Sequence, residues 1–222
     1  MKQYLILLTA LLSINVFAQE AKRKNTIGIG FFVAPEVNGV FLKGKISGQS
    51  IQPGIGFSGG LDASFAFGEH LLLRTGIGYG YRQFDYVLED LIFSTTILNN
   101  EPPSTARYEM AFHEIQIPVL VHYKFSIPLF IGGGVELPLT FKAPSYRTLN
   151  EIPSEGYTTT RYDFTTPLNA VIQLSIGYQF QFKEKYYLMV EPVFRHYLRS
   201  FSVPNGNFYS AGLKMSFRMN VN

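Results

Sequence analysis

The sequence predicts an all-β fold, an eight-stranded antiparallel up-and-down β-barrel that crosses a membrane, and three observations predict it. Eight stretches of the chain alternate apolar residues with polar or small ones at period two, as strands with two different faces do. The connections between them are alternately long and short, which is typical of barrels with short periplasmic turns and long outer loops. The chain also begins with a segment typical of an export signal.

The first residues predict a cleaved secretory signal peptide over residues 1–18. Lys2 supplies a positive charge, a short apolar run follows, and Ala18 is a small residue suited to cleavage before Gln19. The apolar run is too short to span a bilayer as a helix. Residues 19–222 are then expected to form one domain, the barrel, which lies in the bacterial outer membrane as an integral protein.

The composition fits this class of protein. Charged residues make up 16% of the chain, against about 25% in an average soluble protein, while the mean hydropathy is only +0.09. A barrel with one lipid-facing and one polar face has this balance. Cysteine is absent, which excludes disulfides and thiol chemistry. The formal charge is +3, and +2 without Lys2, so no nucleic-acid partner is expected.

The connections are predicted from the gaps between the alternating stretches. Short periplasmic turns are expected at residues 68–70, 126–128 and 183–185. Long outer loops are expected at residues 35–53, 89–107, 143–163 and 199–207. With an even number of strands, both ends of the barrel then lie in the periplasm, and we expect a monomer.

The faces of the strands follow from parity, because successive side chains of a strand point to opposite sides. The first two strands, near residues 26–34 and 54–67, are rich in glycine and alternate less clearly. In the third, alternate residues from Leu71 to Tyr81 are mostly apolar or aromatic, while those between them include Arg74 and three glycines. Charge is costly against lipid, so the second set is interior.

The other five strands repeat this pattern. Their outward apolar residues recur at alternate positions and begin at Ile115, Leu129, Leu168, Tyr186 and Tyr209. A soluble lipocalin-like barrel would need the opposite parity, with apolar residues inside. Outward faces this apolar would cause aggregation in water, so the membrane interpretation is favoured.

Inward charged residues are predicted to fill the lumen: Asp62, Arg74, Arg82, Glu114, Glu136, Glu191, Arg195 and Lys214. Eight strands leave an interior just wide enough for side chains, and unpaired buried charges are costly, so we expect an interlocked ion-pair plug. Asp62 and Arg74 are equidistant from Gly68 and should pair side by side across their hairpin. A proton or ion path through these charges is the alternative.

Enzymatic activity is not expected. Some small outer-membrane barrels are lipid-modifying enzymes with a histidine and a serine on the outer rim. His196 or His113 could be combined with Ser200, Ser202 or Ser104, but nothing in the sequence fixes their geometry. No metal-binding motif is present, and the glycine-rich fragments do not complete a nucleotide-binding motif, so no cofactor is expected.

The last alternating stretch also resembles a barrel-assembly signal, in which a polar residue, a glycine, an apolar residue and a final aromatic residue follow at fixed spacing. Ser210, Gly212, Met215 and Phe217 occupy these positions. The barrel-assembly machinery is therefore an expected partner, as is outer-membrane lipid. Five residues follow Phe217, whereas such signals usually end the chain.

One hairpin carries a family resemblance. Residues 114–125 read EIQIPVLVHYKF, and residues 128–134 read PLFIGGG. With the signal peptide and the eight strands, this pattern resembles the PorT-like family of outer-membrane β-barrel proteins of Gram-negative bacteria, over the whole mature chain. The resemblance implies the barrel, and no catalytic residue is carried over. Some members of that family are linked to protein secretion.

Two functions remain open from the sequence. The first is a structural, accessory or partner-binding barrel that contacts envelope or secretion proteins through its outer loops. Tyr146, Arg147, Tyr157 and Arg161 are its candidate contact residues, since tyrosine and arginine are frequent at binding hot spots. The second is a narrow transport or ligand-uptake pore. Conductance of the purified protein in planar bilayers distinguishes the two.

Overall fold

The computed structural model describes residues 26–42, 48–91, 104–142, 144–152, 156–163, 170–183, 185–198 and 206–221. These residues form the strands β1 (Ile27–Leu42), β2 (Gln49–Phe67), β3 (Leu71–Leu91), β4 (Ser104–Lys124), β5 (Leu129–Lys142), β6 (Pro144–Ile152), β7 (Gly156–Asp163), β8 (Val171–Phe182), β9 (Tyr186–Tyr197) and β10 (Gly206–Val221). Within these ranges, no helix is long and apolar enough to cross a membrane. The expected signal peptide lies outside the described residues.

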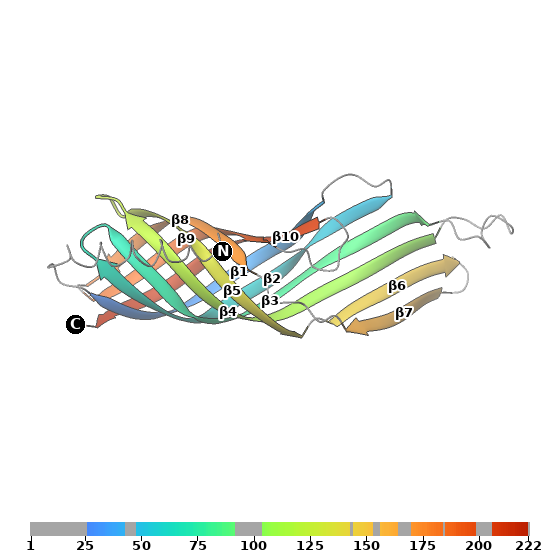
Figure 1. Ribbon diagram of the computed structural model, residues 1–222, viewed down its shortest axis with the longest axis horizontal. Helices are drawn as coiled ribbons and strands as arrows, with labels where there is room; N and C mark the ends of the chain where they lie inside the picture. The colour runs from blue at the N-terminus through green and yellow to red at the C-terminus, as the bar shows by residue number, and fades with distance from the viewer. Residues whose placement is uncertain are drawn as a thin grey trace, which may run out of the picture.

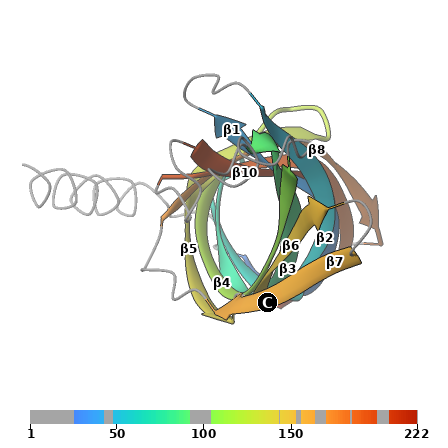
Figure 2. The ribbon, with the colours of Figure 1, turned by 90° about the vertical axis from the view of Figure 1, so that its right-hand side faces the viewer.

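Eight of the ten strands close into a ring, in the order β1–β2–β3–β4–β5–β8–β9–β10 and back to β1. All neighbours are antiparallel, and Figure 2 shows the ring seen along its length. The first and last strands join with Ile27 opposite Val221. The predicted eight-stranded antiparallel barrel is therefore confirmed. Closure gives every strand of the ring two neighbours, so the ring has no open edge.

The remaining strands, β6 and β7, form a hairpin beside the barrel (Figure 1). The long connection expected over residues 143–163 does lie between the barrel strands β5 and β8, but most of it is strand, which the sequence analysis did not predict. β4 continues past the end of β5, and β6 pairs with that extension, with Ser145 opposite Met110 and Asn150 opposite Thr105. Threonine and tyrosine residues, which favour strands, are frequent in β7.

The strands differ in length around the ring. β3 and β4 each have 21 residues, whereas β8 and β9 each have 12. A membrane-spanning strand needs about 9–11 residues. One wall of the barrel therefore projects well beyond the bilayer, and the β6–β7 hairpin lies against that projection (Figure 1). We call the end of the barrel that carries this projection the long-loop end, and the opposite end the short-turn end.

The short-turn end has the predicted connections at residues 68–70 and 126–128. Gly68 has φ of +69°, a conformation that glycine adopts readily. The third turn includes Lys183 and Lys185, and residue 184 lies outside the described residues. At the long-loop end, much of residues 35–53 and 89–107 belongs to strands, so those predicted loops were too long.

The first strand is predicted near residues 26–34, and its end at Ala34 is wrong, because β1 continues to Leu42. β1 pairs with β10 at Val33 opposite Met215 and again at Glu36 opposite Gly212, in one continuous register. Pro35 lacks an N–H and so leaves out one ladder bond, but it does not shift or end the strand.

The predicted faces are confirmed in all eight barrel strands. Outward residues such as Ile77 and Leu174 are about half exposed, at 55% and 56%, whereas inward residues such as Arg74 and Arg195 are 1% exposed. Leu168 lies outside the described residues. The outer surface is thus apolar and the lumen is densely filled with polar and charged side chains.

Candidate functional site

The inward faces bring charged side chains together in two clusters at different heights of the lumen. The upper cluster, nearer the long-loop end, consists of Glu36, Arg82, Glu114, Glu136 and Arg195. The lower cluster, nearer the short turns, consists of Asp62, Arg74, His122, Glu191 and Arg218. All eight predicted lumenal residues are buried. Seven of them belong to the two clusters. Lys214 does not, and its Nζ lies 4.1 Å from the centre of the Phe32 ring.

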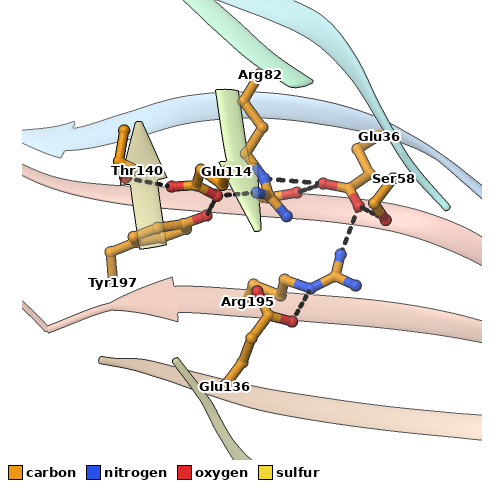
Figure 3. Close-up of polar contacts among 9 residues, drawn as sticks. Glu36, Ser58, Arg82, Glu114, Glu136, Thr140, Arg195 and Tyr197 are labelled. Carbon is orange, nitrogen blue, oxygen red and sulfur yellow. Dashed lines mark hydrogen bonds and ion pairs between the residues drawn. The ribbon is translucent and has the colours of Figure 1, made fainter. Parts of the chain in front are cut away.

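Glu36 is the centre of the upper cluster (Figure 3). Its carboxylate accepts hydrogen bonds from Arg82 Nε at 3.0 Å and from Arg195 Nη1 at 2.6 Å. The hydroxyl groups of Ser58 and Ser210 donate to it as well, at 2.6 and 2.5 Å. One carboxylate therefore ties together residues from β1, β2, β3, β9 and β10.

The two arginines of the upper cluster each bridge this central carboxylate to a further one. Arg82 also donates to Glu114, which accepts further bonds from the hydroxyl groups of Thr140 at 3.3 Å and Tyr197 at 2.9 Å. Arg195 Nε donates to Glu136 at 3.2 Å. Both guanidinium groups thus lie between carboxylates, as burial of a charge requires.

The sequence analysis missed Glu36, because it placed this residue in an outer loop. A signal was present, since Val37 continues the outward positions of the strand and is 50% exposed. The alternation therefore runs through Pro35, with Glu36 on the inward face.

In the lower cluster Arg74 is the centre. Its Nη2 donates to Asp62 Oδ2 at 2.8 Å and its Nη1 to Glu191 Oε1 at 2.5 Å, while Ser216 lies 3.1 Å away. Arg218 Nη2 donates to the same Oδ2 of Asp62, at 2.6 Å. The ion pair predicted between Asp62 and Arg74 is therefore present.

The predicted side-by-side placement of that pair is wrong. Asp62 lies opposite Gly76, and Arg74 lies opposite Ser64. The hairpin is centred on Glu69, one residue further along than assumed, because Phe67 pairs with Leu71. The ion pair is diagonal, which a long arginine side chain can reach across neighbouring strands.

His122 packs tightly beside the lower cluster. Its Nε2 lies 3.5 Å from Glu191 Oε2 and 3.4 Å from Ser175 Oγ. A Cβ atom at Gly132, on the neighbouring strand, would lie 2.0 Å from its Cδ2 atom. A glycine at position 132 therefore leaves room for the His122 ring.

The clusters differ in how completely their polar atoms are hydrogen-bonded. Within the described part of the chain, six buried side-chain atoms of the lower cluster have no hydrogen-bond partner: Asp62 Oδ1, Arg74 Nε, His122 Nδ1, Glu191 Oε2, Arg218 Nε and Arg218 Nη1. In the upper cluster this is true only of Glu136 Oε1 among the described residues. The upper cluster is thus nearly saturated and the lower one is not.

An apolar cluster fills the lumen on the long-loop side of the upper cluster. It consists of Val40, Phe84, Tyr86, Met110, Phe112, Val171, Tyr197 and Phe208. The ring centre of Phe208 lies 5.4 Å from that of Phe84 and 4.8 Å from that of Tyr197. Tyr197 joins the two layers, since its hydroxyl also reaches Glu114.

The rim histidines take part in polar contacts with neighbours. His113 Nδ1 lies 2.7 Å from the Tyr79 hydroxyl, and His196 Nε2 lies 3.3 Å from Asn207 Nδ2. Ser200 and Ser202, and the side chain of Ser104, lie outside the described residues. In the part of the chain that is described, no group of three or more histidine, aspartate and glutamate residues could hold a metal ion.

The candidate contact residues of the outer region lie on the β6–β7 hairpin. Tyr146 is opposite Arg161, Arg147 is opposite Thr160, and Tyr157 is opposite Asn150. The backbone register thus puts a tyrosine and an arginine in one cross-strand pair. Their side chains lie outside what the structure describes.

The four residues of the predicted assembly signal divide between the faces of β10. Ser210 is buried in the lumen, where it donates to Glu36. A Cβ atom at Gly212 would lie 2.9 Å from Glu36 Cγ, so a glycine here leaves room for that side chain. Met215 and Phe217 face outward and are exposed.

A family model described as "Outer membrane protein beta-barrel domain" matches residues 17–218. No curated protein sequence matches the chain. Among solved structures, Ail, the attachment invasion locus protein of Yersinia pestis, has 7% identity over 86% of this chain and 97% of that one, with a TM-score of 0.40. Neisserial surface protein A has 11% identity over 85% and 96%, with a TM-score of 0.35. The outer membrane protease OmpT of Escherichia coli has 11% identity over 88% and 95%, with a TM-score of 0.32.

Proposed function

Because this chain belongs to the outer membrane protein β-barrel family and is an integral protein of the outer membrane, we propose that it serves as a structural, accessory or partner-binding protein through its long-loop end. In such barrels the short turns face the periplasm and the longer connections face outward. The short-turn end at Gly68 is then periplasmic. Protease added to intact cells should cut within residues 89–107 and should spare residues 183–185.

The observation that carries the proposal is the double closure of the lumen. The upper cluster bridges five strands through Glu36, and the apolar cluster around Phe84 and Phe208 lies directly beyond it. An ion that crossed the barrel would have to separate buried ion pairs and then enter a site lined by aromatic rings, both at high cost. A non-conducting barrel is the function class that this lumen supports best.

The long-loop end offers the surface that a partner would need. β3 and β4 extend about ten residues past the length required to cross the bilayer. The β6–β7 hairpin enlarges that extension and brings Tyr146 and Arg161 into one cross-strand pair. Tyrosine and arginine are enriched at binding hot spots. We propose this hairpin as the docking element.

The partner we favour is a protein of the cell envelope or of a secretion apparatus. The resemblance of residues 114–134 to the PorT-like family supports this choice, since some members of that family are linked to secretion. We also propose that Ser210, Gly212, Met215 and Phe217 are read by the barrel-assembly machinery before the barrel closes.

The test compares two double variants of the hairpin by crosslinking in cells. Tyr146→Ala with Arg161→Ala should abolish a crosslinked partner. Thr148→Ala with Thr159→Ala is the matched control, since these two residues form another cross-strand pair of the same hairpin. Both proteins should keep the gel mobility of a folded barrel. Equal crosslinking in both variants would contradict the hairpin as the docking element.

A separate measurement tests the alternative of a narrow pore. The purified wild-type protein in a planar bilayer should give no steady current. Steady, ion-selective single-channel currents from the wild type would instead support transport through the lumen.

A further inference from the structure

The short-turn end of the barrel contains two adjoining cavities, of about 510 Å³ and about 260 Å³. Glu69, Lys124 and Gln179 line both, so the two lie side by side. The smaller cavity lies at the mouth of the lumen, where Arg218 lines it. The larger lies between the turn at residues 126–128 and the end of β8.

The larger cavity is a notch in the barrel wall. β5 begins at Leu129, which lies opposite Tyr178, whereas β8 continues to Phe182. The last four residues of β8 therefore extend past β5 on that side. Phe125, Phe180 and Phe182 line the notch and are 45–51% exposed on the lipid-facing side of the wall. The notch thus joins the lipid-facing surface to the mouth of the lumen.

Arg218, which lines the smaller cavity, has hydrogen-bond donors that the protein does not use. Its Nη2 donates to Asp62 Oδ2, which also accepts from Arg74. Its Nε and Nη1 have no hydrogen-bond partner among the described residues, although the residue is only 3% exposed. A buried guanidinium with two free donors is costly unless an acceptor occupies the space beside it, and an oxyanion matches its geometry best.

The charged residues that line the two cavities also favour an oxyanion. Two cations, Lys124 and Arg218, and one carboxylate, Glu69, line the two cavities. Glu69 is already engaged in another interaction. Arg218 shares one carboxylate oxygen of Asp62 with Arg74, and Arg74 is also paired with Glu191. The site therefore favours an anion.

We propose that this notch binds a phospholipid of the periplasmic leaflet through its phosphate group. The phosphate accepts hydrogen bonds from Arg218 and Lys124, and the acyl chains lie over Phe125, Phe180 and Phe182. The apolar rim distinguishes a lipid from a free anion, because burial of acyl chains against it adds a hydrophobic contribution that inorganic phosphate lacks.

The experiment titrates the purified full chain, in a neutral detergent, with dihexanoyl phosphatidylglycerol and follows the backbone amide signals of Phe130 and Gln179 by NMR. Saturable shifts are expected. Lys124→Gln should weaken the affinity roughly tenfold, the effect of losing one charge-assisted hydrogen bond. Lys185→Gln removes an exposed lysine at the same end that lines neither cavity, and should leave the affinity unchanged.

A second pair of variants tests the apolar rim. Phe182→Ser should weaken binding of the lipid, whereas Ile27→Ser should not, since Ile27 is an exposed apolar residue at the same end but outside the notch. Inorganic phosphate, titrated alone, should bind far more weakly than the lipid. Equal affinity for inorganic phosphate would overturn the lipid assignment. Absence of saturable shifts, or equal losses in Lys124→Gln and Lys185→Gln, would overturn the site itself.

Discussion

The upper and lower charge clusters are built from the same residue types but differ in completeness. In the upper cluster the carboxylate of Glu36 receives two guanidinium donors and two hydroxyl donors. In the lower cluster a single oxygen of Asp62 serves two arginines, and its other oxygen has no hydrogen-bond partner among the described residues. The upper cluster is a nearly saturated structural plug, whereas the lower one leaves several buried donors and acceptors without a partner among the described residues.

The difference follows from what borders each cluster. Beyond the upper cluster lies the apolar cluster around Phe84, which excludes water, so each buried charge there needs a protein partner. Below the lower cluster lies the cavity lined by Lys124 and Arg218. Polar atoms there can be satisfied from outside the protein.

The largest expected effect is that of Glu36→Gln. The substitution keeps the shape of the side chain but removes the charge that Arg82 and Arg195 share, so the unfolding free energy should fall by about 3–5 kcal/mol. Urea unfolding in lipid vesicles measures it. Glu136→Gln is the control, because that carboxylate accepts one arginine bond, and it should cost clearly less. Similar losses in both variants would mean that Glu36 is not the centre of the plug.

A double-mutant cycle on Asp62→Asn and Arg74→Gln measures the strength of the lower cluster. The two side chains are in direct contact and both are buried, so we expect a coupling energy of about 1–3 kcal/mol. Because Arg218 still binds Asp62 when Arg74 is replaced, the coupling should stay below the effect of Glu36→Gln. Zero coupling would show that the ion pair does not stabilise the barrel.

Gly132→Ala tests how tightly the lower cluster is packed. The new methyl group would collide with the His122 ring, and overpacking of this kind costs about 1–3 kcal/mol. Gly133→Ala is the matched control, since its nearest neighbour is the Leu174 side chain on the lipid-facing side, at 3.1 Å. If both variants unfold at the same urea concentration as the wild type, the lower cluster has more free space than the structure indicates.

The smallest effect is expected at the exposed pair of Asp85 and Arg107, on the projecting wall. The hydrogen bond to Asp85 raises the pKa of the Arg107 guanidinium, but the arginine side chain is 48% exposed. Asp85→Asn should therefore change the unfolding free energy by less than about 1 kcal/mol. A loss as large as that of Glu36→Gln would break the distinction between buried and exposed pairs.

The sequence by itself determined which residues face lipid and which face the lumen. Leu73 and Arg74 take opposite faces because side-chain direction in a strand is a local property of the backbone. The turn at residues 68–70 could also be predicted from local sequence, since a short connection with a glycine suffices. The number of barrel strands and the outer-membrane class followed from such local patterns.

Only the tertiary structure decided the heights at which these residues meet. Asp62 pairs diagonally with Arg74 because the hairpin register is set by contacts along the whole strand. Glu36 reaches Arg82 and Arg195 only after the ring has closed and brought β1, β3 and β9 around one lumen. β6 can pair with β4 only because β5 ends before the extension of β4 does, which leaves that part of β4 without its barrel neighbour. Register, closure and strand length are non-local quantities, and period-two alternation carries no information about them.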